Sequence, residues 1–164
     1  MTPLGEQPAP AHAGEGEDLG LVDAMAQLSF LVHGALTEIA ARHGLSIIQT
    51  RLLGVLRDRT PTMNELGRYL GLDKSSITGL VDRAQRRGLV TRTVSAVDRR
   101  AFLISITATG RHVGGQVAAQ FAGHIETLAA GLSDADRRQL SRLASQLVAA
   151  GANAQAANQD ATIG

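Results

Sequence analysis

The sequence predicts a mainly α-helical fold with one small β-hairpin, and three observations carry this prediction. Leu, Val, Ile and Ala supply the apolar residues, whereas aromatic side chains make up only 2% of the 164 residues. Leu and Ala favour helices, and apolar residues recur at helical spacing along most of the chain. The exception is the segment 89–106, where two strand-like runs flank a charged tip. The chain is long enough to bury a core, and its apolar fraction of 44% is ordinary for a globular protein.

The composition excludes several kinds of chemistry. The chain has no Cys, so disulfides, thiolate metal sites and thiol redox sensing are excluded. Its first residues are rich in Pro, Gly and acidic side chains, and they lack the basic start and apolar stretch of a secretory signal. We find no apolar run that approaches the length of a membrane span. We therefore expect a cytoplasmic protein with no membrane partner.

The net charge of +1 conceals an uneven distribution of charge. Between Ser46 and Ser105 there are eleven basic and five acidic side chains, which gives this segment a net charge of +6. The remaining residues carry a net charge of −5. A basic surface confined to one part of the chain is where an anionic polymer would bind.

The N-terminal part of the chain predicts a tail followed by one long helix. Residues 1–17 contain almost no large apolar residue, so we expect them to be disordered. The pattern in 18–45 predicts a helix that ends near Arg42, with Gly44 as a left-handed stop. Its apolar residues fall on more than one side, so one face can pack on its own subunit and another on a partner subunit.

Two short helices are predicted next. Ser46 is a candidate N-cap for a helix that ends around Asp58, before Pro61 breaks the pattern. Thr62 is the next candidate N-cap, and Glu65 completes a capping box. This third helix is expected to end at Gly71, after which Asp73 or Ser75 caps a fourth helix.

The fourth helix, at about residues 74–87, has two chemically different faces. Ile77, Leu80, Val81 and Ala84 cluster on one side at helical spacing. Small polar and basic residues occupy the other side: Ser75, Ser76, Thr78, Gly79, Asp82, Arg83 and Arg86. Short side chains would let this helix lie deep in the major groove of DNA, with Arg reaching base edges or phosphates. An ordinary solvated face is the alternative, and the charged hairpin that follows favours DNA.

A β-hairpin is predicted after the fourth helix. Leu89 to Val94 and Ala101 to Ile106 are the predicted strands, and we expect inward side chains at Leu89, Phe102, Ile104 and Ile106. The tip, residues 95–100, carries two adjacent arginines that packing explains poorly. We expect Arg99 to enter a minor groove. Asp98 is expected to hold Arg100, and with it the tip, through a bidentate pair with the guanidinium.

Two further helices are predicted for 107–151. Thr107 is the candidate N-cap of the first and Ser133 starts the second. Gly151 is expected to end the last helix, leaving residues 152–164 as a disordered tail.

Three runs of residues lie at characteristic spacings in this chain. They are Glu65-Leu66-Gly67 with Leu70-Gly71-Leu72, Lys74-Ser75-Ser76 with Leu80-Val81-Asp82-Arg83 and Arg87-Gly88-Leu89-Val90, and Asp98-Arg99-Arg100 with Ile106-Thr107 and Gly110. In combination they resemble the MarR family of bacterial transcription regulators over roughly residues 20–150. The resemblance implies a winged helix-turn-helix lobe at 46–106, flanked by N- and C-terminal dimerisation helices at 18–45 and 107–151.

The resemblance also implies how such a protein works. A homodimer would present two recognition helices to successive major grooves of a palindromic operator in double-stranded DNA, about one helical turn apart. Many members are repressors that a small phenolic or anionic effector releases, and that effector commonly lies between the dimerisation helices and the DNA-binding lobe. This sequence has Gly79 where larger, often basic, residues are common in relatives. The absence of Cys and of Trp argues against the thiol-oxidation branch and the branch with a Trp-lined pocket.

The predicted function is therefore sequence-specific DNA binding by a homodimeric repressor. The predicted DNA-binding residues are Thr62, Lys74, Ser75, Ser76, Thr78, Gly79, Asp82, Arg83, Arg86, Asp98, Arg99 and Arg100. The alternative is a protein-interaction module on the same fold without specific DNA binding, which only Gly79 favours. No nucleophile motif, phosphate-binding loop or paired carboxylates indicate an enzyme.

Histidines are the remaining candidates for chemistry. His33 and His43, and His112 and His124, are spaced so that neither pair lies on one helix face, which disfavours a metal site, and we expect no cofactor. His12 lies in the predicted tail. His33 with Thr37 and Arg51 is a candidate effector site. The simpler interpretation is a partly buried His33 with a satisfied hydrogen bond.

Overall fold

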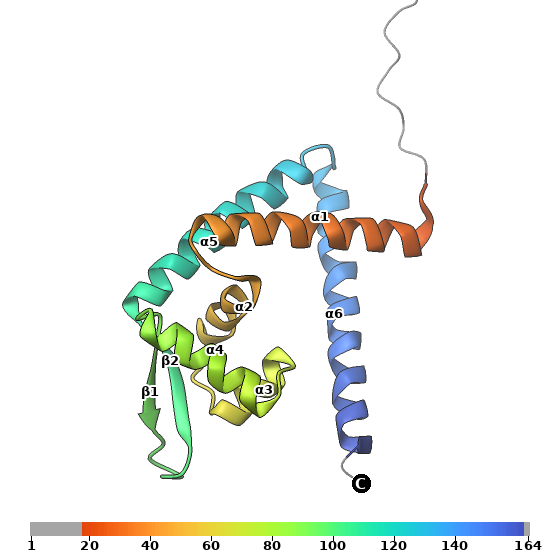
Figure 1. The fold of residues 1–164 in the computed structure, drawn as a ribbon. Helices are drawn as coiled ribbons and strands as arrows, with labels where there is room; N and C mark the ends of the chain where they lie inside the picture. Colours follow the sequence, from red (N-terminus) through yellow and green to blue (C-terminus); the bar gives the residue numbers. More distant parts are fainter. Residues whose placement is uncertain (1–17, 163–164) are drawn as a thin grey trace, which may run out of the picture. The chain divides into compact units, whose positions relative to one another are not determined.

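The computed structural model describes residues 18–162, and Figure 1 shows its elements. They are α1 (Gly20–Arg42), α2 (Ile47–Leu56), α3 (Met63–Leu70), α4 (Lys74–Arg86), β1 (Val90–Val94), β2 (Phe102–Ile106), α5 (Ala108–Leu128) and α6 (Asp134–Thr162). The predicted fold class, mainly α with a small β-wing, is confirmed. The chain divides by its contacts into two units, Met1–Gly34 and Ala35–Gly164, and α1 runs through the boundary. The predicted tail at 1–17 lies outside the described residues.

The described part of the N-terminal unit is the first stretch of α1, and it is strongly apolar at its surface. Its exposed large side chains are Leu19, Leu21, Val22, Met25, Leu28, Phe30 and Leu31. By length and composition α1 is apolar enough to cross a membrane. The expectation that no apolar segment approaches the length of a membrane span is therefore wrong for this helix. Single polar residues interrupt the apolar run of α1, but the mean hydropathy of the helix remains high. One such helix is weak evidence for a membrane, because the core helix of a soluble protein and a signal sequence can have the same length and composition.

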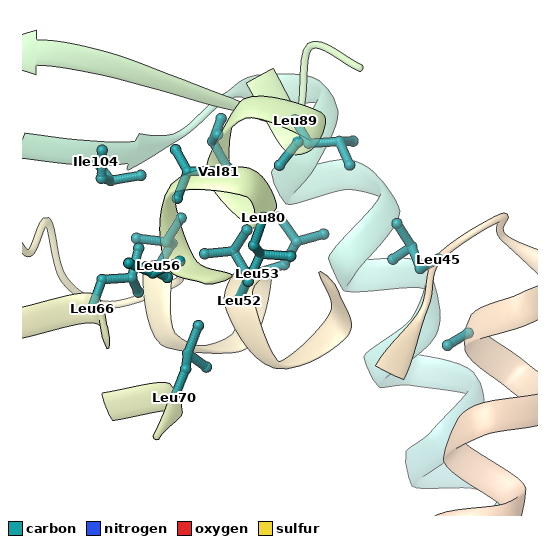
Figure 2. Close-up of a cluster of buried hydrophobic side chains, with 14 of the residues drawn as sticks. Leu45, Leu52, Leu53, Leu56, Leu66, Leu70, Leu80, Val81, Leu89 and Ile104 are labelled. Atoms are coloured by element: carbon teal, nitrogen blue, oxygen red, sulfur yellow. The ribbon is translucent and has the colours of Figure 1, made fainter. Parts of the chain in front are cut away.

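The core of the second unit is aliphatic and draws on all of its first elements. Figure 2 shows side chains from α2, α3, α4 and β2 meeting in one cluster. Its fully buried members include Leu52, Leu66, Leu80 and Ile104. Burying a side chain of this kind contributes roughly 1.5–3 kcal/mol, so the cluster fixes α4 and the hairpin on α2 and α3.

Local capping sets where the helices begin and end. The side chains of Ser46, Thr62, Asp73 and Thr107 each accept a backbone N–H at the start of α2, α3, α4 and α5. The predicted caps are thus confirmed, with Asp73 rather than Ser75 at α4. Gly44, Gly71 and Gly88 have φ of 66°, 66° and 68°, the left-handed conformation that glycine tolerates without strain. The second helix ends at Leu56, slightly before the predicted Asp58.

The hairpin is antiparallel, and its register runs from Val90↔Ile106 at the base to Val94↔Phe102 at the outer end. Leu103, which lies next to the outer pair of the register, also bridges Thr62, and this ties β2 to the start of α3. The predicted inward position of Phe102 is wrong, since 47% of this residue is exposed. Phe102 does lie on the same face of β2 as the buried Ile104. It belongs to the outermost pair of the register, however, and is therefore exposed.

The C-terminal helices continue further than the sequence predicted. α5 packs against α2, with Val117 buried in the core. α6 runs without a break through Gly151 to Thr162. The predicted helix end at Gly151 and the predicted disordered tail are therefore wrong for residues 152–162. Gly inside a helix costs only about 1 kcal/mol relative to Ala, and the residues after Gly151 are rich in Ala, which offsets that cost.

Candidate nucleic-acid interface

The two faces of α4 are separated as the sequence predicted. Ile77, Leu80, Val81 and Ala84 are buried. Lys74, Ser75, Ser76, Thr78, Arg83 and Arg86 are exposed, and Gly79 and Asp82 are half-buried. The apolar side anchors the helix in the core, so the opposite side is free to contact a partner. That side has the small polar and basic residues that the major groove of DNA accepts.

Asp73 organises the N-terminal end of α4. Its carboxylate accepts the Ser76 N–H at 2.8 Å and the hydroxyls of Ser75 and Ser76 at 2.7 Å each. The backbone hydrogen bond from Ser76, followed by the two hydroxyls, holds the pKa of Asp73 well below its ordinary value. The carboxylate is therefore ionised at neutral pH. The hydroxyl of Thr78 in turn donates to the Lys74 carbonyl at 2.7 Å.

Gly79 leaves space that an arginine occupies. A Cβ atom at this position would lie 3.1 Å from Nη1 of Arg83. The guanidinium of Arg83 therefore lies across the middle of the exposed face of α4. The absent side chain of Gly79 thus makes room for Arg83.

Asp82 has a structural partner that the sequence analysis missed. Its carboxylate pairs with the guanidinium of Arg92 on β1. Arg92 lies on the same inward face of β1 as Val90, and its Nε is buried without a hydrogen-bond partner. A charged residue at an inward strand position was the available signal for this pair. Asp82 thus joins the fourth helix to the hairpin, whereas we had assigned it to DNA.

The hairpin tip is held by a residue that the sequence analysis overlooked. The Ser95 hydroxyl is buried and accepts the N–H groups of Val97 and Asp98 at 3.2 and 3.3 Å. Asp98 accepts the backbone N–H of Arg100 at 2.9 Å. None of the ion pairs found among residues 18–162 includes Asp98, so the predicted guanidinium pair is wrong. The backbone is nearer to Asp98 than the long side chains, and both Arg99 and Arg100 are exposed.

Thr62 has a capping role. Its N–H and its hydroxyl both donate to the Glu65 carboxylate at 2.8 Å, and its hydroxyl oxygen accepts the Glu65 N–H. The backbone hydrogen bond from Thr62, then its hydroxyl, lowers the pKa of Glu65. Thr62 is half-buried, so its hydroxyl is already committed to the start of α3.

Arg87, whose role was also not predicted from the sequence, holds the C-terminal end of α4. Its Nη1 donates to the Gly44 carbonyl at 2.8 Å and to Oε1 of Gln49 at 3.1 Å. The same Oε1 accepts the Ser46 N–H, so Gln49 joins the cap of α2 to the fourth helix. The sequence gives no signal for this contact, because Arg87 is 43 residues from Gly44 and 38 from Gln49.

The candidate effector residues lie at the surface. His33, Thr37 and Arg51 are all exposed, and His33 belongs to the N-terminal unit. The simpler expectation, a partly buried His33, is therefore wrong. An apolar cavity of about 280 Å³ lies instead in the second unit and is lined by Leu36, Thr50, Leu53, Gly54, Arg57, Ile106, Arg111, Gly114, Gly115, Val117, Ala118 and Phe121. Three of these residues are glycines, and residues that contribute no side chain are hard to recognise as a pocket from sequence.

No metal centre is evident in the part of the chain that the structure describes. Residues 18–162 contain no group of three or more His, Asp or Glu side chains that could hold a metal ion. His43 has a buried Nε2 without a hydrogen-bond partner. The remaining histidine, His12, lies outside the described range.

These elements define the class of the domain. A capped helix, a glycine turn and a second helix with an exposed basic face are followed by a two-stranded hairpin packed on the same core. This arrangement is a winged helix-turn-helix.

Comparison with known proteins agrees with this class, since residues 43–101 match the MarR family. The transcriptional activatory protein BadR of Rhodopseudomonas palustris is 33% identical over 91 residues, which cover 53% of this chain and 52% of BadR. The organic hydroperoxide resistance transcriptional regulator of Bacillus subtilis is 32% identical, covering 51% and 63%. The matched segment thus spans about half to two thirds of these relatives.

Solved structures agree. CouR from Rhodococcus jostii RHA1, bound to p-coumaroyl-CoA, is 26% identical with a TM-score of 0.63, covering 76% of this chain and 88% of CouR. Over its winged-helix lobe this chain is therefore similar to proteins of the MarR family.

Proposed function

We propose that this protein is a transcription regulator that binds a palindromic operator in double-stranded DNA as a homodimer. The observation that carries the proposal is the exposed face of α4, which joins small polar side chains to Arg83 and Arg86 on a helix fixed by its buried side. The hairpin adds Arg99 and Arg100 at an exposed tip. The surrounding segment has a net charge of +6, which suits a polyanion. Repression is the proposed output, although BadR is named as an activatory protein.

Exposed apolar helices support the dimer. In α6 the side chains of Leu140, Leu143, Leu147 and Val148 are exposed, and the N-terminal unit exposes the apolar face of α1. Exposed patches of this kind mark interaction sites. In a cytoplasmic regulator a second subunit would cover them, and light scattering should give a dimeric mass without detergent. A monomeric mass, or a requirement for detergent, contradicts this part of the proposal.

The apolar cavity supports a small-molecule effector. Arg111 donates to the Arg57 carbonyl at 3.4 Å, and both arginines line an otherwise largely apolar space. Such a lining suits an apolar ring that carries an acidic group. CouR was solved with p-coumaroyl-CoA, so p-coumarate and its CoA thioester are suitable first probes. We expect Arg111→Ala to weaken release of DNA by an active probe, whereas Arg138→Ala on α6 should not.

DNA binding is tested with the region upstream of the protein's own gene. Fluorescence anisotropy across a range of salt concentrations gives both the affinity and the number of phosphate contacts, since each contact contributes about −0.9 to the log–log slope. Arg99→Ala and Arg100→Ala should each weaken binding and flatten the slope by up to about one. Ser76→Ala and Thr78→Ala should change sequence preference instead. Arg138→Ala, which removes an exposed arginine from α6, is the control.

The outcomes separate the proposed function from its alternative. Absence of binding even at low salt would favour a protein-interaction module on the same fold. Unchanged affinity and slope in both wing variants would remove the hairpin from the mechanism while leaving α4 in it.

A further inference from the structure

The end of the hairpin is unexpectedly apolar for a surface that meets DNA. Val97 is 98% exposed, and the cross-strand pair Val94 and Phe102 is about half exposed. Single exposed hydrophobic residues are ordinary. Here three of them share one end of a two-stranded ribbon, and Val97 lies between the last strand residues and the two arginines of the tip.

The turn presents Val97 in a defined position. The buried Ser95 hydroxyl accepts the Val97 N–H at 3.2 Å, and Ser95 N–H donates to the Ala101 carbonyl at 2.9 Å. Ala101 N–H donates to the Asp98 carbonyl at 2.9 Å, which closes the turn. The backbone around Val97 is therefore hydrogen-bonded, while its side chain has almost no protein neighbour. An isopropyl group held away from the protein is available to a partner.

The neighbouring charges indicate which partner this is. Arg99 and Arg100 are exposed within three residues of Val97, and the tip belongs to the basic segment. A minor groove offers phosphates at its rims for arginines, and its walls are the apolar faces of deoxyribose. An apolar side chain beside basic residues is the combination that minor-groove proteins use. The tip is also part of the lobe that carries the exposed face of α4.

We propose that Val97 is a specificity-determining residue that packs into the minor groove and favours A·T over G·C pairs at the position of the wing. Two effects, a steric clash and a loss of hydration, should disfavour G·C pairs. The floor of the minor groove carries the guanine N2 amino group at a G·C pair, whereas an A·T pair has only acceptors there. The amino group occupies the space that the isopropyl group needs, and it loses hydration if an apolar group covers it. This inference rests on the proposed DNA binding.

The test uses an operator located by footprinting with the full-length protein. We would then compare the affinities of three duplexes that carry A·T, G·C or inosine·C at the base pairs protected by the wing. Inosine lacks only the N2 amino group, so the major groove stays the same as with guanine. The wild-type protein should bind the A·T and inosine·C duplexes about equally and the G·C duplex about fivefold to tenfold more weakly, which is the lower end of the usual cost of one mismatched pair.

Two substitutions at Val97 isolate the side chain. Val97→Ala should weaken binding to the A·T duplex by up to about fifteenfold, because two buried methyl groups are lost, and should largely abolish discrimination against G·C. Val97→Thr keeps the shape and replaces one methyl by a hydroxyl, so it should retain the steric part of the discrimination. Arg138→Ala, at an exposed arginine of α6, is again the control.

The outcomes are distinguishable from those of the proposed function. If no DNA is bound, the proposed function fails. If DNA is bound but inosine·C and G·C duplexes bind equally, or Val97→Ala leaves both affinities unchanged, only the role of Val97 is overturned. If Val97→Ala leaves both DNA affinities unchanged but no longer binds a protein that the wild type binds, the hairpin tip is a binding site for that protein.

Discussion

The two ends of helix α4 are held in different ways. At the N-terminal end, Asp73 binds Ser75 and Ser76, and every contact spans two or three residues of chain. At the C-terminal end, Arg87 reaches Gly44 across 43 residues and Gln49 across 38. The Thr107 hydroxyl donates to the Gly88 carbonyl just beyond the helix, across 19 residues. One end is organised by its own sequence and the other by the rest of the second unit.

This difference has a mechanical consequence. Local hydrogen bonds form whenever the helix forms, so the N-terminal end keeps its geometry if neighbouring elements shift. The C-terminal end is attached to the turn between α1 and α2, to β1 and to the start of α5. A shift of those elements reaches α4 through these contacts. Substitutions at the two ends should therefore behave differently.

The largest expected effect is at the start of α5, where Gly110 passes close to the chain that follows α4. A Cβ at this position would lie 2.1 Å from the Leu89 carbonyl oxygen. Gly110→Ala must separate α5 from the base of the hairpin, and overpacking of this kind costs about 3 kcal/mol. Urea denaturation measures the loss. Gly123→Ala, with open space around its Cβ, should be neutral or stabilising.

The next effect concerns the pair between Asp82 and Arg92. Asp82→Asn leaves the partly buried guanidinium without its anion, which we expect to cost about 1–2 kcal/mol after allowance for solvent screening. Arg92→Met removes the charge and keeps the stem, so it should cost less than Asp82→Asn. Chemical denaturation of both variants gives the order, and the reverse order would contradict the structural role of Asp82.

Adjacent arginines at the C-terminal end provide a sharper contrast. Arg87→Ala should lower the free energy of unfolding by about 1 kcal/mol, because two hydrogen bonds to Gly44 and Gln49 are lost. Arg86→Ala should leave stability unchanged and weaken DNA binding, because Arg86 is exposed on the recognition face. Equal effects of the two variants on both measurements would show that α4 is not anchored at this end.

The smallest effect at neutral pH is expected at the N-terminal end, where Asp73 is exposed. Its pKa is lowered on folding, so its stabilisation is present above the ordinary pKa of 3.8 and is lost as the pH falls toward the lower folded pKa. Asp73→Asn should therefore be less stable than wild type at pH 7. The difference should narrow only below about pH 4. Urea titrations at pH 7, 5 and 3 measure it, and a constant difference would exclude the linkage.

Much of the candidate interface could be predicted because its signals are short-range. The buried positions Ile77, Leu80 and Val81 follow from helical spacing. The tip was predicted less well. Asp98 was assigned to a guanidinium, although a backbone N–H two residues away is the nearer donor. Ser95 was not considered, because nothing in the sequence distinguishes a buried serine from an exposed one.

The sequence by itself determined the helix starts at Ser46, Thr62 and Thr107, the glycine stops at Gly44 and Gly71, and the two faces of α4. These features depend on hydrogen bonds and periodicities that span two to four residues, so no knowledge of the fold is needed. Only the tertiary structure decided the partners of Asp82 and Arg87, the exposure of Phe102 and the glycine-lined cavity. Those depend on which distant segments the hydrophobic core brings together, and on where the hairpin extends beyond that core.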